Sequence, residues 1–299
     1  MTKTSIALAA LALPLTTQAQ LTVVNDTFSG ADRNTQNLPS SSAWYLGPSN
    51  ASSPGTLGVA DGQLQYRSAL TGSAFWAMTY FTDSGSVTIA DGETLRISFD
   101  LTFTEVRAND NNAFQFGIFN SGGSRIGEDL TATSDGAFAN YTGYKLVVNP
   151  SANEVSPSAD STARSGMFKR TGEHNHPFSA DAHTVLGSYQ SEVDWAGSNF
   201  VAIAGTPLSV TLSLTRTGDE LLFTATLGEW TAYRTDASGT FSFDTFGVLT
   251  GTQTFTVGNG INIDNFNISV VSSIPEPSST AALGGAIALG AVALRRRRR

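Results

Sequence analysis

Apolar and polar residues alternate strictly along several stretches of this chain. In Leu95–Phe103 every second residue is Leu, Ile or Phe and the residues between them are polar, and Leu208–Leu214 follows the same pattern. Successive side chains of a β-strand point to opposite faces, so these stretches place their apolar residues on one face. The alternation therefore predicts strands with one face buried and the other in water.

Turn residues separate these strand candidates. Gly218-Asp219 lies between Leu208–Leu214 and the apolar-rich Leu221–Leu227, and it predicts a tight hairpin with a primed turn. Further strand candidates are Leu21–Phe28, Gln63–Ser68, Phe75–Phe81, Ala113–Asn120, Gly143–Asn149, Asn199–Ile203, Thr240–Leu249 and Ile261–Val270. About ten to twelve strands with no sustained helical period are typical of a sandwich. We expect an all-β fold, a two-sheet antiparallel jelly-roll sandwich, with residues 151–198 as an extended loop or insertion at one edge.

The N-terminal residues have the layout of a secretory signal peptide. A lone Lys3 precedes an apolar run, and small residues stand at the first and third positions before a cleavage point after Ala19. A buried N-terminal helix is the alternative, which Pro14 disfavours. We therefore expect residues 1–19 to be a signal helix that directs export, and residues 20–273 to be the exported domain.

The C-terminal residues 274–299 form a second address. Pro275-Glu276-Pro277 is followed by an apolar run over residues 280–294 and then by five arginines, Arg295 to Arg299. A helix of this length rises about 22 Å, which is short of the roughly 30 Å hydrocarbon core. Arginines that stay in the cytoplasm would hold such a helix with the domain outside. The tail is thus suited to a transient stay in the inner membrane.

This tail resembles the PEP-CTERM sorting signal of Gram-negative bacteria, which joins Pro-Glu-Pro, a short apolar helix and a basic cluster. The resemblance implies processing near Pro275 by an exosortase, then attachment or release at the cell surface or extracellular matrix of a cell that makes exopolysaccharide. The apolar helix would be removed, as in a GPI signal. A plain tail anchor is the alternative reading.

Charge and residue usage exclude several classes of function. Six of the 17 basic residues are Lys3 and Arg295 to Arg299, so the rest of the chain carries 11 basic against 25 acidic residues, about −14. This acidic balance argues against a nucleic-acid partner. The absence of cysteine removes disulfides, thiolate metal sites and cysteine nucleophiles. Phosphate-binding loops, Gly-x-Ser-x-Gly and His-Glu-x-x-His are also absent.

Five segments between the two ends carry a further resemblance. They are residues 25–30, 61–64, Leu95–Phe103, Phe114–Asn120 and 263–266, and they look like the concanavalin A-like lectin/glucanase (LamG-like) jelly rolls. The resemblance implies two curved sheets, a concave face that commonly binds glycans, and edge loops that sometimes hold calcium.

Aromatic side chains are the usual platforms for sugars, because a ring covers the apolar C–H face of a pyranose. The candidates for carbohydrate binding are Trp44, Trp76, Tyr80, Trp195 and Trp230, with Tyr45 and Tyr233 beside two of them. Aromatic residues of a sandwich also fill its core, which is the alternative for each. Because Phe75 and Trp76 are neighbours on one strand, one of the two points away from the core.

Two groups of residues have ligands that metals prefer. His174, His176 and His183 could close a zinc or nickel site, but Pro177 and the surrounding Gly, Ser and Ala favour an exposed loop. Asp110 and Asn112 offer oxygen ligands, which makes calcium the candidate cofactor, but Asn and Asp are also ordinary hairpin residues.

Catalysis is not expected. Glu192-Val193-Asp194-Trp195 begins like the Glu-x-Asp-x-Glu motif of one glucanase branch, but Ala196 replaces the last glutamate. A retaining glycosidase needs two carboxyl groups about 5 Å apart. The sequence therefore favours a non-enzymatic protein that binds or organises extracellular polysaccharide. A structural matrix or adhesion protein without a glycan site, and a glycoside hydrolase with an incomplete motif, are the alternatives.

Overall fold

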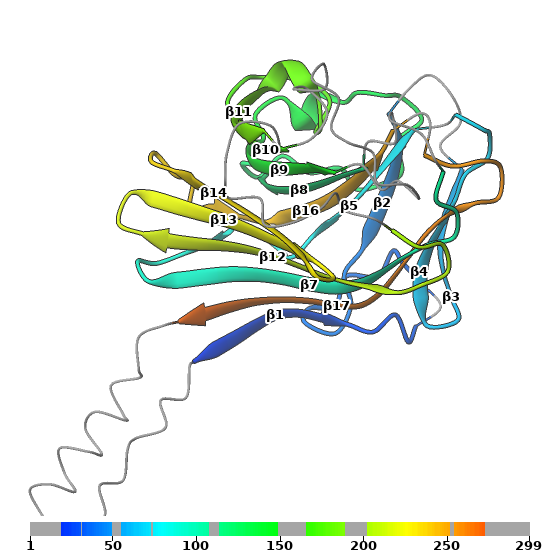
Figure 1. Cartoon of the computed structure of the whole chain (residues 1–299), viewed down its shortest axis with the longest axis horizontal. Coiled ribbons are helices and arrows are strands. Elements are labelled where there is room, and N and C mark those ends of the chain that lie inside the picture. The colour runs from blue at the N-terminus through cyan, green and yellow to red at the C-terminus, as the bar shows by residue number, and fades with distance from the viewer. Residues whose placement is uncertain are drawn as a thin grey trace, which may run out of the picture. The chain divides into compact units, whose positions relative to one another are not determined.

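The computed structural model describes residues 19–30, 32–49, 55–72, 74–107, 114–148, 166–188, 202–251 and 254–272. Residues Gln20–Val271 form one compact unit. Its strands make two large antiparallel sheets that lie face to face (Figure 1).

The first sheet has eight strands in the order β14-β13-β12-β7-β17-β4-β3, with β1 also paired to β17. Its strands are β1 (Gln20–Asp26), β3 (Thr56–Ala60), β4 (Gln63–Arg67), β7 (Glu93–Phe103), β12 (Leu208–Thr217), β13 (Glu220–Leu227), β14 (Trp230–Asp236) and β17 (Gly260–Ser272).

The second sheet has seven strands in the order β11-β10-β9-β8-β16-β5-β2. Its strands are β2 (Trp44–Pro48), β5 (Phe75–Tyr80), β8 (Phe114–Asn120), β9 (Thr142–Val148), β10 (Gly166–Arg170), β11 (His183–Ser188) and β16 (Thr245–Thr250). A small separate pair is formed by β6 (Val87–Thr88) and β15 (Ser242–Phe243).

The predicted all-β, two-sheet antiparallel and jelly-roll-like architecture is confirmed. Within the described ranges the helical elements are the two 3-10 turns η1 (Gly136–Phe138) and η2 (Ala180–Ala182). The signal helix and the C-terminal apolar helix were predicted for residues that lie outside these ranges.

The alternating stretches form the strands that they predict. Along β7 and β12 the apolar residues face the core and the polar residues between them are more exposed. The hairpin between β12 and β13 is also confirmed, with Thr217 paired to Glu220 and a two-residue turn between them. Gly218 has a φ of 60°, which suits the first central position of a primed turn.

Two expectations about the strands need correction. Residues 151–198 were expected to form an extended loop or insertion at one edge, and within this stretch β10 and β11 are strands that extend one edge of the seven-stranded sheet. The sequence of β10 does not alternate because four of its five residues, on both faces, are buried. The candidate strand Thr240–Leu249 is divided at Asp244, and Ile203 is exposed coil rather than strand.

The longest strand of the fold, β17, changes its partner halfway along one side. Its first half pairs with β4, through Gly260 opposite Arg67, and its second half pairs with β1, through Val271 opposite Gln20. The change occurs at Asn265, whose φ of 52° marks a local irregularity. The other side of β17 is bonded to β7, so the strand is held from both sides.

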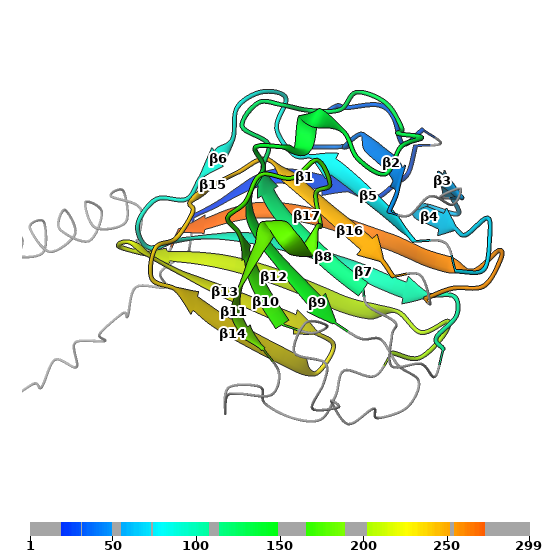
Figure 2. The ribbon, with the colours of Figure 1, turned by 90° about the horizontal axis from the view of Figure 1, so that it is seen from above.

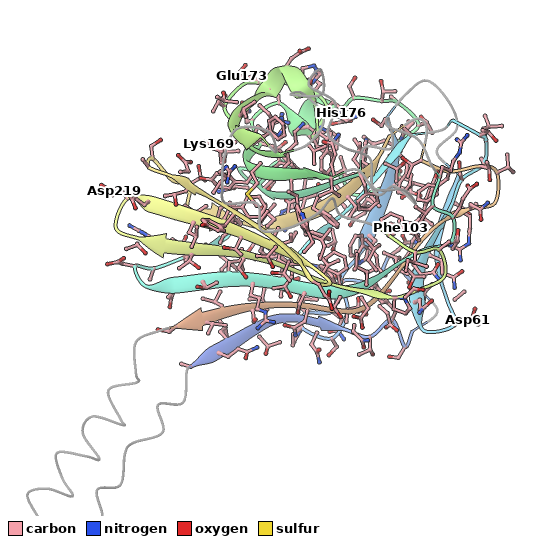
Figure 3. All side chains as sticks on the ribbon, viewed as in Figure 1. Asp61, Phe103, Lys169, Glu173, His176 and Asp219 are labelled. Carbon is pink, nitrogen blue, oxygen red and sulfur yellow. The ribbon has the colours of Figure 1, made fainter. Side chains whose placement is uncertain are left out.

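Aromatic side chains fill the space between the two sheets. The ring of Phe99 on β7 lies 6.0 Å from that of Phe116 and 5.5 Å from that of Phe246, both on the opposite sheet. It also lies 6.1 Å from the ring of Phe266 on its own sheet. Figure 3 labels Phe103, a second member of this core, between the layers. Burial of such rings is the main attraction between the sheets.

Phe99→Ala tests this role. Removing the ring leaves a cavity between the sheets, and we expect the free energy of unfolding to fall by about 3–5 kcal/mol. Ser98→Ala, which changes the neighbouring residue on the outer face, should alter it by less than about 0.5 kcal/mol. Urea denaturation of both variants measures the difference, and similar effects would contradict this account of the core.

Candidate functional site

The outer face of the seven-stranded sheet is covered by two segments, residues 121–141 and 171–182. Figure 2 shows these segments, which carry η1 and η2, lying over the sheet. They close a second apolar cluster against it, whose buried members are Trp76, Met78, Tyr80, Phe119, Ile126, Phe138, Tyr141, Phe178 and Leu249. We call the two segments the cover. This face therefore offers no open groove in the region that the cover occupies.

Arg170 on β10 holds the two segments of the cover together. Its side chain is 2 % exposed, and its guanidinium donates hydrogen bonds of 2.7–3.0 Å to backbone carbonyls only. The accepting carbonyls belong to Phe138, Tyr141, His174, His176 and Pro177. A buried polar group is costly unless it is hydrogen-bonded, and here each of the five N–H donors of the guanidinium is bonded to a carbonyl.

A second arginine fastens the first segment of the cover. Arg125 forms an ion pair of 2.9 Å with the fully buried Asp244 and donates to the Thr82 hydroxyl at 2.7 Å. Next to it, the backbone N–H of Ile126 donates to the Tyr80 hydroxyl at 2.9 Å. The cover is thus held by polar contacts as well as by its apolar cluster.

Four of the predicted sugar platforms are buried. Trp44 and Trp76 are 0 % exposed, Tyr80 is 4 % and Trp230 is 7 % exposed. None of them offers a ring face to a sugar in this structure, which corrects the expectation. Trp44 and Trp230 belong to the core between the sheets, while Trp76 and Tyr80 point outward as strand alternation requires but lie under the cover. The fifth candidate, Trp195, lies outside the described residues.

The three histidines do not converge on a metal position. His174 Nδ1 accepts the backbone N–H of His176, and His176 Nδ1 accepts that of Phe178, at 3.0 and 3.1 Å. His183 Nδ1 lies 2.5 Å from the Ser179 carbonyl oxygen, so all three rings are engaged with nearby backbone. In the described part of the chain no group of three His, Cys, Asp or Glu residues could hold a metal ion. Asp110 and Asn112 lie outside that part.

Instead, His176 and His183 belong to a buried basic cluster with Lys145 and Arg170. Burial, together with the neighbouring cations, lowers the pKa of His176 to about 4, that of His183 to about 2 and that of Lys145 to about 7. Lys145 Nζ donates to the Phe178 carbonyl at 2.9 Å. Within the described ranges no ion pair involves any of the four. Figure 3 labels His176 in the cover, above the sheet.

An open site lies beside the cover, where the chain between β1 and β2 meets residues 127–129 of the first cover segment. It consists of two cavities that share Arg33, and we call them together the Arg33 cleft. The first, of about 450 Å³, is lined by Arg33, Asn34, Tyr45, Gly127, Glu128 and Asp129. The second, of about 350 Å³, is lined by Asp26, Phe28, Ser29, Gly30, Asp32, Arg33, Thr35, Ser40, Ser41 and Ser42.

Arg33 joins three distant parts of the chain at the centre of this cleft. Its guanidinium forms a two-pronged ion pair with Asp129, with Nη1–Oδ1 and Nη2–Oδ2 distances of 3.0 and 2.5 Å. It also donates to the carbonyls of Leu57, at 2.7 Å, and of Trp44. Asp129 Oδ1 in turn accepts the backbone N–H of Leu46 at 2.9 Å. Both side chains of the ion pair are therefore fixed in place.

Tyr45 supplies an aromatic ring to the first cavity. It follows the buried Trp44 on β2, so it points to the opposite face of the sheet. Its side chain is half-buried and its ring centre lies 5.8 Å from that of Tyr80, which supports it from below. The surrounding Asn34, Glu128 and Asp129 present polar atoms beside the ring.

The second cavity is rich in oxygen atoms. Asp26 is 5 % exposed, and its Oδ1 and Oδ2 accept the backbone N–H groups of Phe28 and Ser42 at 2.8 and 3.0 Å. The hydroxyl of Ser42, which is 2 % exposed, has no hydrogen-bond partner among the residues described. Hydrogen bonds from Thr35 and from the backbone of Asn34 hold the pKa of Asp32 below its usual value. Asp32 is therefore ionised at neutral pH.

The sequence pointed to Tyr45 only as the neighbour of Trp44, and it did not point to Arg33 or Asp129. These two residues are 96 positions apart in the chain and belong to no spaced motif. No sequence feature set Arg33 and Asp129 apart, because a single Arg and a single Asp in turn-rich segments are ordinary surface residues.

No family model matches the chain. No curated protein matches it either. Among solved structures it is similar to the potassium-bound carbohydrate recognition domain of Emp46p, at 9 % identity and a TM-score of 0.47, over 83 % of this chain and 95 % of that one. It is also similar to an endo-1,3-beta-glucanase from Streptomyces sioyaensis, at 10 % identity and a TM-score of 0.45, over 89 % of this chain and 100 % of that one. A third similar structure is lectin I-B4 from Griffonia simplicifolia, at 12 % identity and a TM-score of 0.40, over 84 % of this chain and 99 % of that one. Because these TM-scores are below 0.5, the similarities do not assign a function to this chain.

The buried histidines predict a stability that falls as the pH is lowered from about 6.5 to about 4. Between the pKa of an unfolded histidine and the lowered pKa of His176, the unfolded chain binds protons that the folded chain does not. The double variant His176→Asn/His183→Asn keeps a polar atom near each Nδ1 and removes both titrations. Urea denaturation between about pH 4.5 and 7 should show a shallower pH dependence for the variant. An unchanged slope would mean that the rings do not stay neutral under the cover.

Proposed function

We propose that this protein binds carbohydrate and that its glycan site is the Arg33 cleft. The observation that carries the proposal is the half-buried ring of Tyr45 beside the fixed Arg33–Asp129 ion pair. A sugar presents an apolar C–H face to an aromatic ring and hydroxyls around its edge. The ring of Tyr45 can contact the C–H face, and the charged and amide groups beside it can form hydrogen bonds with the hydroxyls.

The arrangement also limits what binding costs. Arg33 and Asp129 are held by backbone groups of two strands, β2 and β3, so little side-chain freedom is left to lose when a ligand arrives. Asp129 remains 42 % exposed in its side chain, so its oxygens stay within reach of a sugar hydroxyl. A rigid ion pair of this kind selects for the orientation of hydroxyl groups more than it adds affinity.

A structural matrix or adhesion protein is the second candidate function, and the cover favours it. The cover occupies the outer face of the seven-stranded sheet and buries Trp76 and Tyr80 beneath it. A protein built in this way uses the closed face for stability. The acidic balance of its sequence then keeps it soluble and available for bridging by divalent cations, among them calcium.

We also propose that the protein is exported and sorted to the cell surface or extracellular matrix. The support is the sequence of the two ends, with cleavage after Ala19 and exosortase processing near Pro275-Glu276-Pro277. Extracellular polysaccharide is then the partner that the domain meets. In the described ranges no helix is long and apolar enough to cross a bilayer, and residues 280–294 lie outside them. Glu192 and Asp194 of the incomplete glucanase motif also lie outside them, so a non-catalytic role stays a prediction.

Tyr45→Ala tests the glycan site. Removing a stacking ring should weaken polysaccharide binding at least tenfold, since a ring contact of this type contributes about 0.5–1.5 kcal/mol beyond the area that it buries. Tyr233→Ala is the matched control, because Tyr233 is 42 % exposed on the eight-stranded sheet. A glycan array with the full chain identifies a ligand, and calorimetry then compares the three proteins.

Two results would decide against the cleft as the glycan site. Equal losses in the two tyrosine variants would mean that the sugar is not held by Tyr45. Silence across neutral, amino and acidic polysaccharides, together with calcium-dependent self-association, would favour the structural function.

The sorting proposal is tested by identifying the first and last residues of the mature protein. Exosortase processing should remove Arg295 to Arg299, and signal cleavage should leave Gln20 at the N-terminus. Intact mass spectrometry of the protein recovered from the cell surface of a PEP-CTERM-sorting host measures both ends. Recovery of most molecules with Arg295 to Arg299 still attached would rule out the processing step.

A further inference from the structure

We propose that the Arg33 cleft selects polysaccharides whose sugars carry protonated amino groups, that is, polymers of hexosamine. This inference rests on the proposed carbohydrate-binding function and names the class of glycan. It is drawn from the charges that line the two cavities and from a buried hydroxyl in the second.

The lining of the cleft carries four carboxylates and one cation. The carboxylates are Asp26, Asp32, Glu128 and Asp129, and the cation is Arg33. Arg33 is already neutralised by the two-pronged pair with Asp129. Within the described ranges Asp26, Asp32 and Glu128 take part in no ion pair. Three negative charges of the cleft are therefore left without a counter-charge.

This balance discriminates among glycans by their charge. An acidic polysaccharide, with carboxylate or sulfate groups, would bring like charges together and lose their hydration without compensation. A neutral polysaccharide would leave the three carboxylates uncompensated. A protonated amine supplies three N–H donors and a positive charge to carboxylates that can only accept. The formal charge of −8 over the whole chain acts in the same direction at longer range.

A second observation points to a ligand in the second cavity. Ser42 lines this cavity, and its buried hydroxyl has no hydrogen-bond partner among the described residues, although its backbone N–H is bonded to Asp26. Buried polar groups are paired in native proteins, and an unpaired one is a place where a partner is expected. Because Arg33 borders both cavities, a polymer seated on Tyr45 continues past Arg33 toward Asp26 and Ser42. The cleft thus fits an internal stretch of a chain of sugars.

The test compares three hexamers of equal length on the full-length protein by calorimetry. They are a hexamer of glucosamine, the same hexamer N-acetylated, and a hexamer of a uronic acid, each at low and high salt and at a pH where the free amines are protonated. We expect the glucosamine hexamer to bind at least fivefold more tightly than the acetylated one, and the uronate hexamer not to bind. The preference should shrink at high salt because exposed charges are screened.

Glu128→Gln removes one uncompensated charge while keeping the shape of the side chain. The substitution should reduce the affinity for the glucosamine hexamer about two- to fivefold more than the affinity for the acetylated hexamer, as expected for one exposed charge pair. Asp219→Asn is the matched control, since Asp219 lies in the turn between β12 and β13, as Figure 3 shows. It should leave both affinities unchanged.

The outcomes separate this inference from the function on which it rests. Equal or tighter binding of the acetylated or the uronate hexamer would overturn the preference for amines and leave carbohydrate binding intact. If Glu128→Gln and Asp219→Asn weaken glucosamine binding equally, the binding is a general attraction to an acidic surface. This result would also overturn the preference for amines at the Arg33 cleft. Failure of every hexamer to bind would overturn both.

Discussion

The five hydrogen bonds from Arg170 to backbone carbonyls are the interaction on which the functional geometry depends. They join the two segments that close the outer face of the seven-stranded sheet. With that face closed, the aromatic residues that the strands point outward, such as Trp76 and Tyr80, become a second core. Tyr45, on the same face of the sheet, stays half-buried and lines the Arg33 cleft beside the first cover segment. The buried guanidinium of Arg170 thus helps to keep the outer face closed over Trp76 and Tyr80.

Arg33, Arg125 and Arg170 share a structural role in a chain that has no cysteine. Each joins segments far apart in the sequence, as in the pairs Arg33–Asp129 and Arg125–Asp244. The planar guanidinium suits this role because it offers five donors in fixed directions and stays charged at all physiological pH values. These contacts act where the strands end and apolar burial no longer fixes the path of the backbone.

Strand alternation predicted the architecture but not the site. In β7 and β12 the period of two assigns each residue to one face, and the structure confirms it. The same rule fails for β10, because the cover buries its outer face as well and residues of both faces are therefore buried. Phe138, Tyr141 and Phe178, aromatic residues in largely polar stretches, were the available sign that these stretches pack against the sheet. The pairing of Arg33 with Asp129 depends on contacts between distant segments, which no local pattern records.

The placement of β17 has a mechanical consequence. This strand has 13 residues and is hydrogen-bonded to β7 on one side and to β4 and β1 on the other. A pull on its C-terminal end acts along the strand, so the hydrogen bonds on both sides carry the load in parallel and would have to break together. Strands loaded at right angles lose their bonds one by one and give way at far smaller forces. Tension directed along β17 from this end would therefore load the hydrogen bonds to β7, β4 and β1 together.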